Sequence, residues 1–145
     1  MSLSNRSLND LLTDGGWAPD RRVPDRVAEW RGALEQHKRF VMHPAAEAVL
    51  LEFGGLKVGS TRPGVQRASA RINFDPMLAV GEEDRLLDYF PALTGLNLFP
   101  LGEVDDGHAF FAISASGETF CVGDEIYGRW PTFRAALEAL LLGRT

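Results

Sequence analysis

The chain has 145 residues, a usual size for one domain, and we expect a single domain over residues 1–145. Hydrophobic residues make up 45% of it and charged residues 24%, which excludes a disordered or fibrous protein. Its single cysteine, Cys121, excludes an internal disulfide. No apolar run is long enough to span a membrane, and residues 1–12 are too polar for a signal peptide. These features predict a cytoplasmic protein that does not bind membranes.

The net charge of −5 is unevenly distributed along the chain. Residues 1–74 carry 11 lysines and arginines against 8 acids, whereas residues 75–128 carry 1 against 11. Arg85 is the one basic residue of that acidic stretch. Such a stretch repels nucleic acid and favours a positively charged partner. The alternative interpretation is that solvated turns and loops happen to be acidic.

Three helices are expected in the N-terminal half. The first is a short helix over residues 8–12, with Ser7 as its N-cap and two glycines after it. An extended linker over residues 17–24 follows, because each of its two prolines disfavours helix in the residue before it. Asp25 is expected to cap the second helix. The third is expected over residues 44–53, with a proline in its first turn and a double glycine at its end.

Two short strands are expected next, over residues 56–58 and 68–74, with a loop containing Gly59–Gly64 between them. Residues 82–90 have the apolar spacing of a helix, with Leu86, Leu87 and Phe90 on one side.

The second half contains the clearest structural pattern. Segments 96–104, 109–114 and 118–122 are separated by two glycine-containing turn sequences, which predicts an antiparallel meander. Residues 109–113 are apolar at both alternating sets of positions, so this strand is expected in the middle of the sheet, covered on both faces. Thr132 is expected to cap a final helix that closes at a glycine.

Helices followed by strands that are themselves bracketed by helices predict the α+β class. We expect a central mixed or antiparallel sheet with a C-terminal meander, flanked by N-terminal helices and a C-terminal helix. The apolar periodicities also predict a core. Its expected members are Trp30, Leu50, Phe53, Phe74, Leu87, Phe111, Ile113, Phe133, Leu137 and Leu140.

The sequence contains no pattern typical of catalysis or metal binding. Its three histidines, His37, His43 and His108, are not spaced as metal ligands. Cys121 stands between two apolar neighbours, which favours a buried strand residue over a nucleophile. No glycine-rich loop stands between a strand and a helix, where a phosphate would be held. We therefore expect no catalytic residue, no metal and no cofactor.

The acidic pairs have ordinary structural explanations as well. Asp105 and Asp106 precede a glycine, as turn residues often do, and residues 82–84 suit the first turn of a helix. Arg62, Arg67 and Arg71 form a modest basic strip without aromatic residues between them. Direct binding of nucleic acid is not expected from such a strip in a protein with a pI near 5.2.

Several segments, taken in order, resemble the third subgroup of the SUKH superfamily of bacterial immunity proteins. They begin with a "GW-x-P-x-R" element and include a helix ending in a double glycine, an "F-D-P" strand end, a "P-x-G" turn and a strand–glycine turn–strand unit. In this chain they are Gly15–Val23, Ala48–Leu56, Ile72–Pro76, Phe99–Glu103, Ala112–Phe120 and the final Phe133–Gly143 helix. The resemblance covers about residues 15–143, and it depends on the order and spacing of short elements.

The resemblance implies a cytoplasmic immunity protein that binds and neutralises a cognate protein toxin and has no catalytic site of its own. Many toxins linked to the superfamily act on nucleic acids, and such toxins need a basic cleft. An acidic inhibitor can occupy a cleft of that kind. The implied partner is therefore a toxin with a basic active-site surface, met by a monomer or a weak homodimer. The alternatives are a regulatory or scaffolding module that binds a cellular protein and, after that, a small enzyme or ligand-binding protein.

The candidate partner-binding residues are the carboxylates of the acidic stretch, expected to share one negative field, and two aromatic residues that flank the last acidic pair. They are Glu82, Glu83, Asp84, Asp88, Glu103, Asp105, Asp106, Asp124, Glu125, Tyr127 and Trp130. Aromatic side chains are the usual anchors of protein interfaces. The alternative for the two rings is burial in the core.

Overall fold

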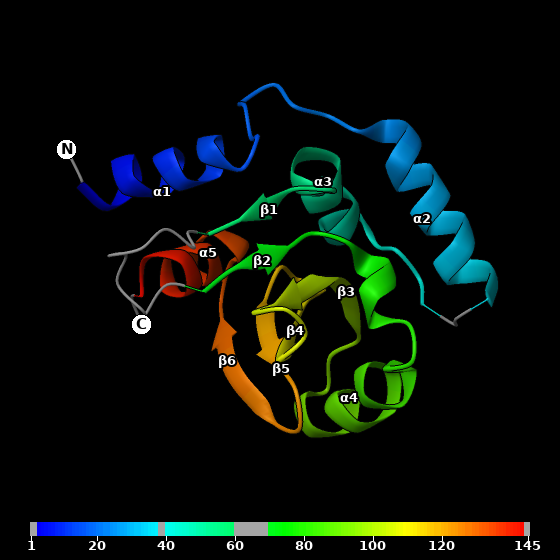
Figure 1. Cartoon of the computed structure of the whole chain (residues 1–145). Helices are drawn as coiled ribbons and strands as arrows, with labels where there is room; N and C mark the ends of the chain where they lie inside the picture. Colours follow the sequence, from blue (N-terminus) through cyan, green and yellow to red (C-terminus); the bar gives the residue numbers. More distant parts are fainter. Residues whose placement is uncertain (1–2, 38–39, 60–69, 144–145) are drawn as a thin grey trace.

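The computed structural model describes residues 3–37, 40–59 and 70–143, in which one antiparallel sheet lies between helices (Figure 1). The strands follow one another across the sheet in chain order. They are β1 (Lys57–Val58), β2 (Ile72–Asn73), β3 (Leu98–Val104), β4 (Ala109–Ser114), β5 (Thr119–Val122) and β6 (Ile126–Trp130). This confirms the α+β class and the meander, and it makes the sheet antiparallel throughout.

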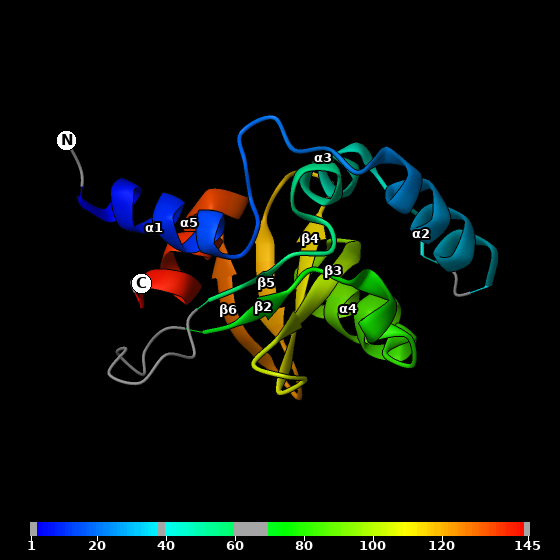
Figure 2. The same cartoon turned by 45° about the horizontal axis from the view of Figure 1, so that its top comes forward.

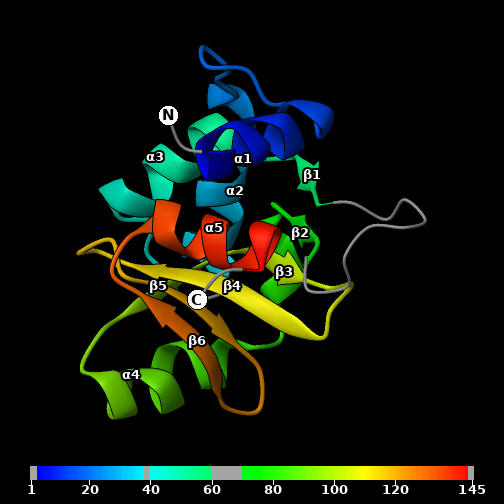
Figure 3. The ribbon, with the colours of Figure 1, turned by 90° about the vertical axis from the view of Figure 1, so that its left-hand side faces the viewer.

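Helices precede the sheet, interrupt it once and follow it. They are α1 (Leu3–Asp14), α2 (Pro24–His37), α3 (Pro44–Phe53), the short turns η1 (Pro76–Ala79) and η2 (Asp84–Tyr89), α4 (Phe90–Thr94) and α5 (Phe133–Leu142). Figure 3 shows α1, α3 and α5 on one side of the sheet and α4 on the other. Leu86 of η2 and Phe90 of α4 are buried on that second side.

The ends of α3 and α5 follow the expected capping chemistry. The His43 ring nitrogen Nδ1 accepts a hydrogen bond of 3.2 Å from the Ala46 N–H at the start of α3. At its end, the Gly54 N–H donates to the Leu50 carbonyl over 2.8 Å. The Thr132 hydroxyl oxygen accepts from the Ala135 N–H over 3.1 Å, which confirms Thr132 as the cap of α5.

A cluster of phenylalanine rings joins the helices to the sheet. The ring of Phe133 on α5 lies 5.1 Å from that of Phe53 on α3 and 5.9 Å from that of Phe111 on β4, between ring centroids. Phe74, directly after β2, lies 5.5 Å from Phe53. Phe111 and its neighbour Ala112 point to opposite faces of β4 and are both fully buried. The central, twice-covered position expected for this strand is therefore confirmed.

Several expected boundaries were wrong. α1 begins at Leu3, so Ser7 lies inside that helix and does not cap it. α2 begins at Pro24, which puts Asp25 in its first turn. Of the strand expected over residues 68–74, β2 occupies only Ile72–Asn73, and residues 60–69 lie outside the described part of the chain.

The helix expected over residues 82–90 is displaced and partly of another kind. Its first part, η2, is π-helical, with the Phe90 N–H bonded five residues back to the Arg85 carbonyl, and the helix then continues through α4. Pro91 supplies a physical reason, because a proline ring collides with the carbonyl four residues earlier in an α-helix and a wider turn relieves that contact. The expected end at Phe90 was therefore too early.

Most of the expected core is buried, and part of it is only half-buried. Trp30, Leu50, Phe53, Phe74, Phe111, Ile113 and Leu137 are buried. Leu87, Phe133 and Leu140 are half-buried and pack against the border of the core.

Candidate protein-binding surface

The sheet topology places the two acidic turns at the same end of the sheet. In an antiparallel meander, alternate connections lie at the same end, so the β3–β4 turn (residues 105–108) and the β5–β6 turn (residues 123–125) share an end, and the β4–β5 turn lies at the other. Figure 2 shows both acidic turns at the bottom of the sheet. We call these two turns, together with η2 and its preceding residues 82–83, the acidic end.

Asp105 and Asp106 form the tip of the β3–β4 hairpin with positive φ angles of 52° and 58°. The His108 N–H donates to the Asp105 carbonyl over 3.3 Å, so Asp106 and Gly107, both with positive φ, are the central residues of a tight turn that matches the twist of a hairpin. Aspartate tolerates positive φ better than most side chains. Asp105 also contacts Arg71, the residue directly before β2: the backbone N–H of Arg71 donates to Asp105 Oδ1 over 2.9 Å. The Arg71 guanidinium forms an ion pair with Asp106. The expected turn role of this pair is confirmed.

Arg85 connects η2 to the β5–β6 turn. Its guanidinium lies 3.5 Å from Glu82 Oε1 and 3.3 Å from Asp124 Oδ1. The Asp124 side chain is nevertheless 87% exposed. Arg85 therefore joins acidic residues that stand some 40 positions apart in sequence, without covering their carboxylates.

Most of the candidate carboxylates are solvent-exposed. Glu82, Glu83 and Glu103 are half-buried, and the exposed ones are Asp84, Asp88, Asp105, Asp106, Asp124 and Glu125. Glu103 precedes the β3–β4 turn on β3, and its Oε2 lies beside Gly107. The Glu83 carboxylate accepts a hydrogen bond of 2.9 Å from the Gly81 N–H.

The two aromatic candidates lie in different places. Tyr127 is 54% exposed, and its hydroxyl accepts a hydrogen bond of 3.3 Å from the Asp124 N–H, so it lies at the acidic end. Trp130 is half-buried and pairs with Thr119, at the opposite end of β5. Neither ring is fully buried. Both residues belong to β6, a strand that the sequence analysis did not predict.

The remaining chemistry-bearing residues have structural surroundings. Cys121 is buried in β5, and this burial, with the negative charge of Asp105, raises the pKa of its thiol to about 11. A thiol of that pKa is a weak nucleophile, which agrees with the buried strand residue expected. Within the described residues, no three His, Cys, Asp or Glu side chains are grouped so as to hold a metal ion. No helix of the described part is long and apolar enough to cross a membrane.

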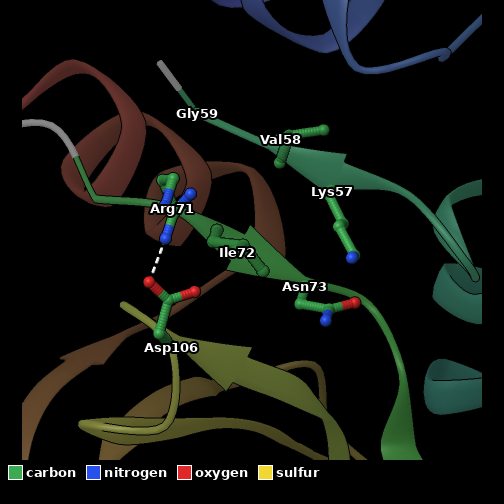
Figure 4. Close-up of a pocket in the computed structure, with 7 residues that line it drawn as sticks. All are labelled: Lys57, Val58, Gly59, Arg71, Ile72, Asn73 and Asp106. Atoms are coloured by element: carbon green, nitrogen blue, oxygen red, sulfur yellow. Dashed lines mark hydrogen bonds and ion pairs between the residues drawn. The ribbon is translucent and has the colours of Figure 1, made fainter. Parts of the chain in front are cut away.

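A polar hollow of about 190 Å³ lies over β1 and β2, close to the acidic end (Figure 4). Lys57 and Asn73 face each other across these two strands, and Arg71 lies two residues before Asn73 on the same face. Asp106 lines the hollow from the β3–β4 turn, with its carboxylate directed at Arg71. The hollow thus contains charges of both signs.

The "GW-x-P-x-R" element has a structural role in this chain. The Trp17 ring N–H donates to Glu52 Oε2 over 2.7 Å. Arg21 donates to the carbonyls of Glu52 and Gly54, over 2.8 Å each, and so caps the C-terminus of α3. Trp17 and Arg21 of this element therefore hold the linker and α3 together.

Fold and surface together define an α+β protein with an acidic end on its sheet. A family model supplies the identity: the SUKH-3 immunity protein model matches residues 5–143, and the chain belongs to this family. The match extends beyond the resemblance found over residues 15–143 and includes most of α1. No curated protein and no solved structure matches the chain.

Proposed function

We propose that this chain binds a cognate protein toxin through its acidic end and blocks a basic active-site surface of that toxin. The family gives the protein its role in immunity. The observation that carries the proposed mode is the Arg85–Asp124 ion pair, since it joins the acidic η2 region to an acidic turn at the same end of the sheet as Asp105 and Asp106. A toxin that cleaves or modifies nucleic acid needs cationic side chains to bind phosphates. Those cationic side chains are complementary in charge to the acidic end.

Electrostatics favours rapid capture by this surface. Residues 75–128 carry 11 acids against one arginine, and the exposed carboxylates stand on η2 and on the two acidic turns. Grouped charges of one sign raise the rate of association with an oppositely charged surface, and salt weakens this effect by screening. Tyr127, exposed beside Asp124, adds an aromatic contact of the kind common at interface centres.

Co-expression tests the function itself. The product of a gene adjacent to this chain's gene, tested as the toxin, is expressed in a susceptible host with and without the chain, and both growth and co-purification are measured. We expect the chain to restore growth and to co-purify with the toxin. Restored growth without any complex, or a complex that leaves the toxin fully active, would contradict neutralisation by direct binding.

Charge reversal tests the proposed surface. The pair D124K/E125K alters two exposed side chains in a turn without positive φ at either position, so the fold should tolerate it. The matched control D20K/E29K makes the same change in net charge at exposed positions before and within α2. We expect D124K/E125K to slow association with the toxin about tenfold or more at low salt, and the control to change it much less. Equal slowing of association by the two double substitutions would contradict binding at the acidic end, because the change in net charge alone would then explain it.

A further inference from the structure

We propose that the outer edge of β6 pairs with an extended segment of the toxin, so that the bound segment becomes a seventh strand of the sheet. This inference rests on the proposed function and specifies how the partner is held. An edge strand exposes unpaired N–H and C=O groups, and a strand from another chain can bind to them.

The two edges of the sheet differ in their cover. At the β1 edge, α1 ends against the strand: a Cβ atom added to Gly15 would lie 2.7 Å from the Lys57 carbonyl oxygen. At the β6 edge, Figures 1 and 3 show no other described helix or strand alongside the outer border of β6. In the described part of the chain, β6 is therefore the edge open to a partner.

The pairing pattern identifies a residue whose backbone faces outward. Hydrogen-bonded and non-hydrogen-bonded pairs alternate along antiparallel strands. The Ser114 N–H donates to the Glu118 carbonyl over 2.9 Å, so these two residues form a hydrogen-bonded pair. Ala112 and Phe120 lie two residues further along each strand and form the next such pair, so the N–H and C=O of Phe120 point toward β4. Phe120 faces Arg129 on its other side, so the N–H and C=O of Arg129 point away from β5.

The side chains around Arg129 leave this edge accessible. Arg129 Nε donates to Glu118 Oε2 over 2.8 Å, and its guanidinium lies 5.2 Å from the centre of the Phe120 ring. The charged side chain is thus held over the sheet face and not across the edge. Edge strands are commonly protected by an internal proline or a lysine, and Ile126–Trp130 contains neither. A register shift opposite Cys121 and Val122 confines regular pairing to the second half of β6.

The occupant that fits is a basic extended segment of the toxin. The acidic turn with Asp124 and Glu125 leads directly into β6, so cationic side chains that flank the added strand would meet carboxylates there. A second copy of this chain fits less well, because each copy carries a net charge of −5 and brings its own acidic turn to the same edge.

The experiment compares R129P with R129A. Both variants lose the contacts of the arginine side chain with Glu118 and Phe120, and R129P alone also loses the outward N–H. An edge strand tolerates proline at such a position. The toxin identified by the co-expression test, inactivated by mutation, serves as the probe in calorimetry. We expect R129P to bind about tenfold more weakly than R129A, with similar thermal stability.

Equal affinity of the two variants would overturn this inference and leave the proposed function intact, whereas absence of binding by the unmodified chain would overturn both. If R129P does not fold, amide exchange in the unmodified chain decides: the Arg129 N–H should become protected in the complex, and unchanged exchange would contradict strand addition. The other possible occupant of this edge is a second copy of the chain, which light scattering of the free protein would detect as a dimer. A dimer that R129P abolishes would assign the edge to a second copy.

Discussion

The linker–α3 junction and the acidic end of the sheet use polar side chains in opposite ways. At the junction, Trp17, Arg21 and Glu52 bond to one another or to backbone carbonyls within the protein. At the acidic end, Asp106 and Asp124 remain 74% and 87% exposed although each has an arginine partner. The junction carries two elements of the family resemblance, and its polar side chains are occupied by hydrogen bonds within the fold. The residues that select a partner must therefore be sought outside it, on surfaces such as the acidic end.

The largest expected effect comes from the core that supports both regions. Phe111 is fully buried and its ring meets those of Phe74 and Phe133, so F111A should lower the free energy of unfolding by about 3–5 kcal/mol. L137A should cost about 2–5 kcal/mol for the same reason. Chemical denaturation measures both, with L93A, at a 61% exposed position, as the control. Losses below about 0.5 kcal/mol at both positions would contradict this description of the core.

The junction itself gives the next largest effect. R21A removes two hydrogen bonds from a charged group to carbonyls at the end of α3, and should lower the free energy of unfolding by about 1.5–3 kcal/mol. R22A, at an exposed neighbouring position, should change it by less than about 0.5 kcal/mol. Toxin affinity should be the same in both variants when measured well below their melting temperatures. A selective loss of binding in R21A would place the junction in the interface and end the contrast with the acidic end.

The sequence predicted the parts of the fold that local chemistry determines. The meander followed from two glycine turns and from a strand apolar on both faces, and α5 from the cap at Thr132 and its apolar spacing. β6 was missed because a glycine, Gly128, stands at the centre of this short segment, and the strand is stabilised by its pairing with β5. The π-helical turn was missed because its apolar residues have ordinary helical spacing.

The acidic end could be predicted only in part. The composition indicated which residues are acidic, and a meander puts alternate turns at one end of a sheet. The roles of Arg71 and Arg85 depend on contacts between distant segments, and no local pattern indicates them. The different positions of Tyr127 and Trp130 could not be foreseen either, since they follow from the unpredicted strand β6.

Arg71 allows the comparison to be sharpened, because it neutralises part of the acidic end from outside the acidic stretch. R71Q keeps the backbone N–H that binds Asp105 and removes the charge that pairs with Asp106. The Arg71–Asp106 ion pair is exposed, so its loss should lower the free energy of unfolding by less than about 1 kcal/mol. Association with a basic toxin should become faster and more sensitive to salt, which stopped-flow measurements at two ionic strengths can detect. Slower association in R71Q would mean that Arg71 itself contacts the toxin.

The smallest effect links the acidic end to the core through Cys121. Burial and the charge of Asp105 raise the pKa of this thiol to about 11 from an ordinary value of 9.0. Because the folded protein keeps the proton more tightly than the unfolded chain, this group makes the protein less stable as the pH rises from 9 toward 11. D105N removes the charge and suits the positive φ of the turn, so it should lower the pKa of Cys121 slightly and leave most of the shift, which burial causes. Thiolate absorbance measured against pH tests this, with D20N, at an exposed position before α2, as the control. An identical titration in D105N and D20N would show that the charge of the acidic end does not reach β5.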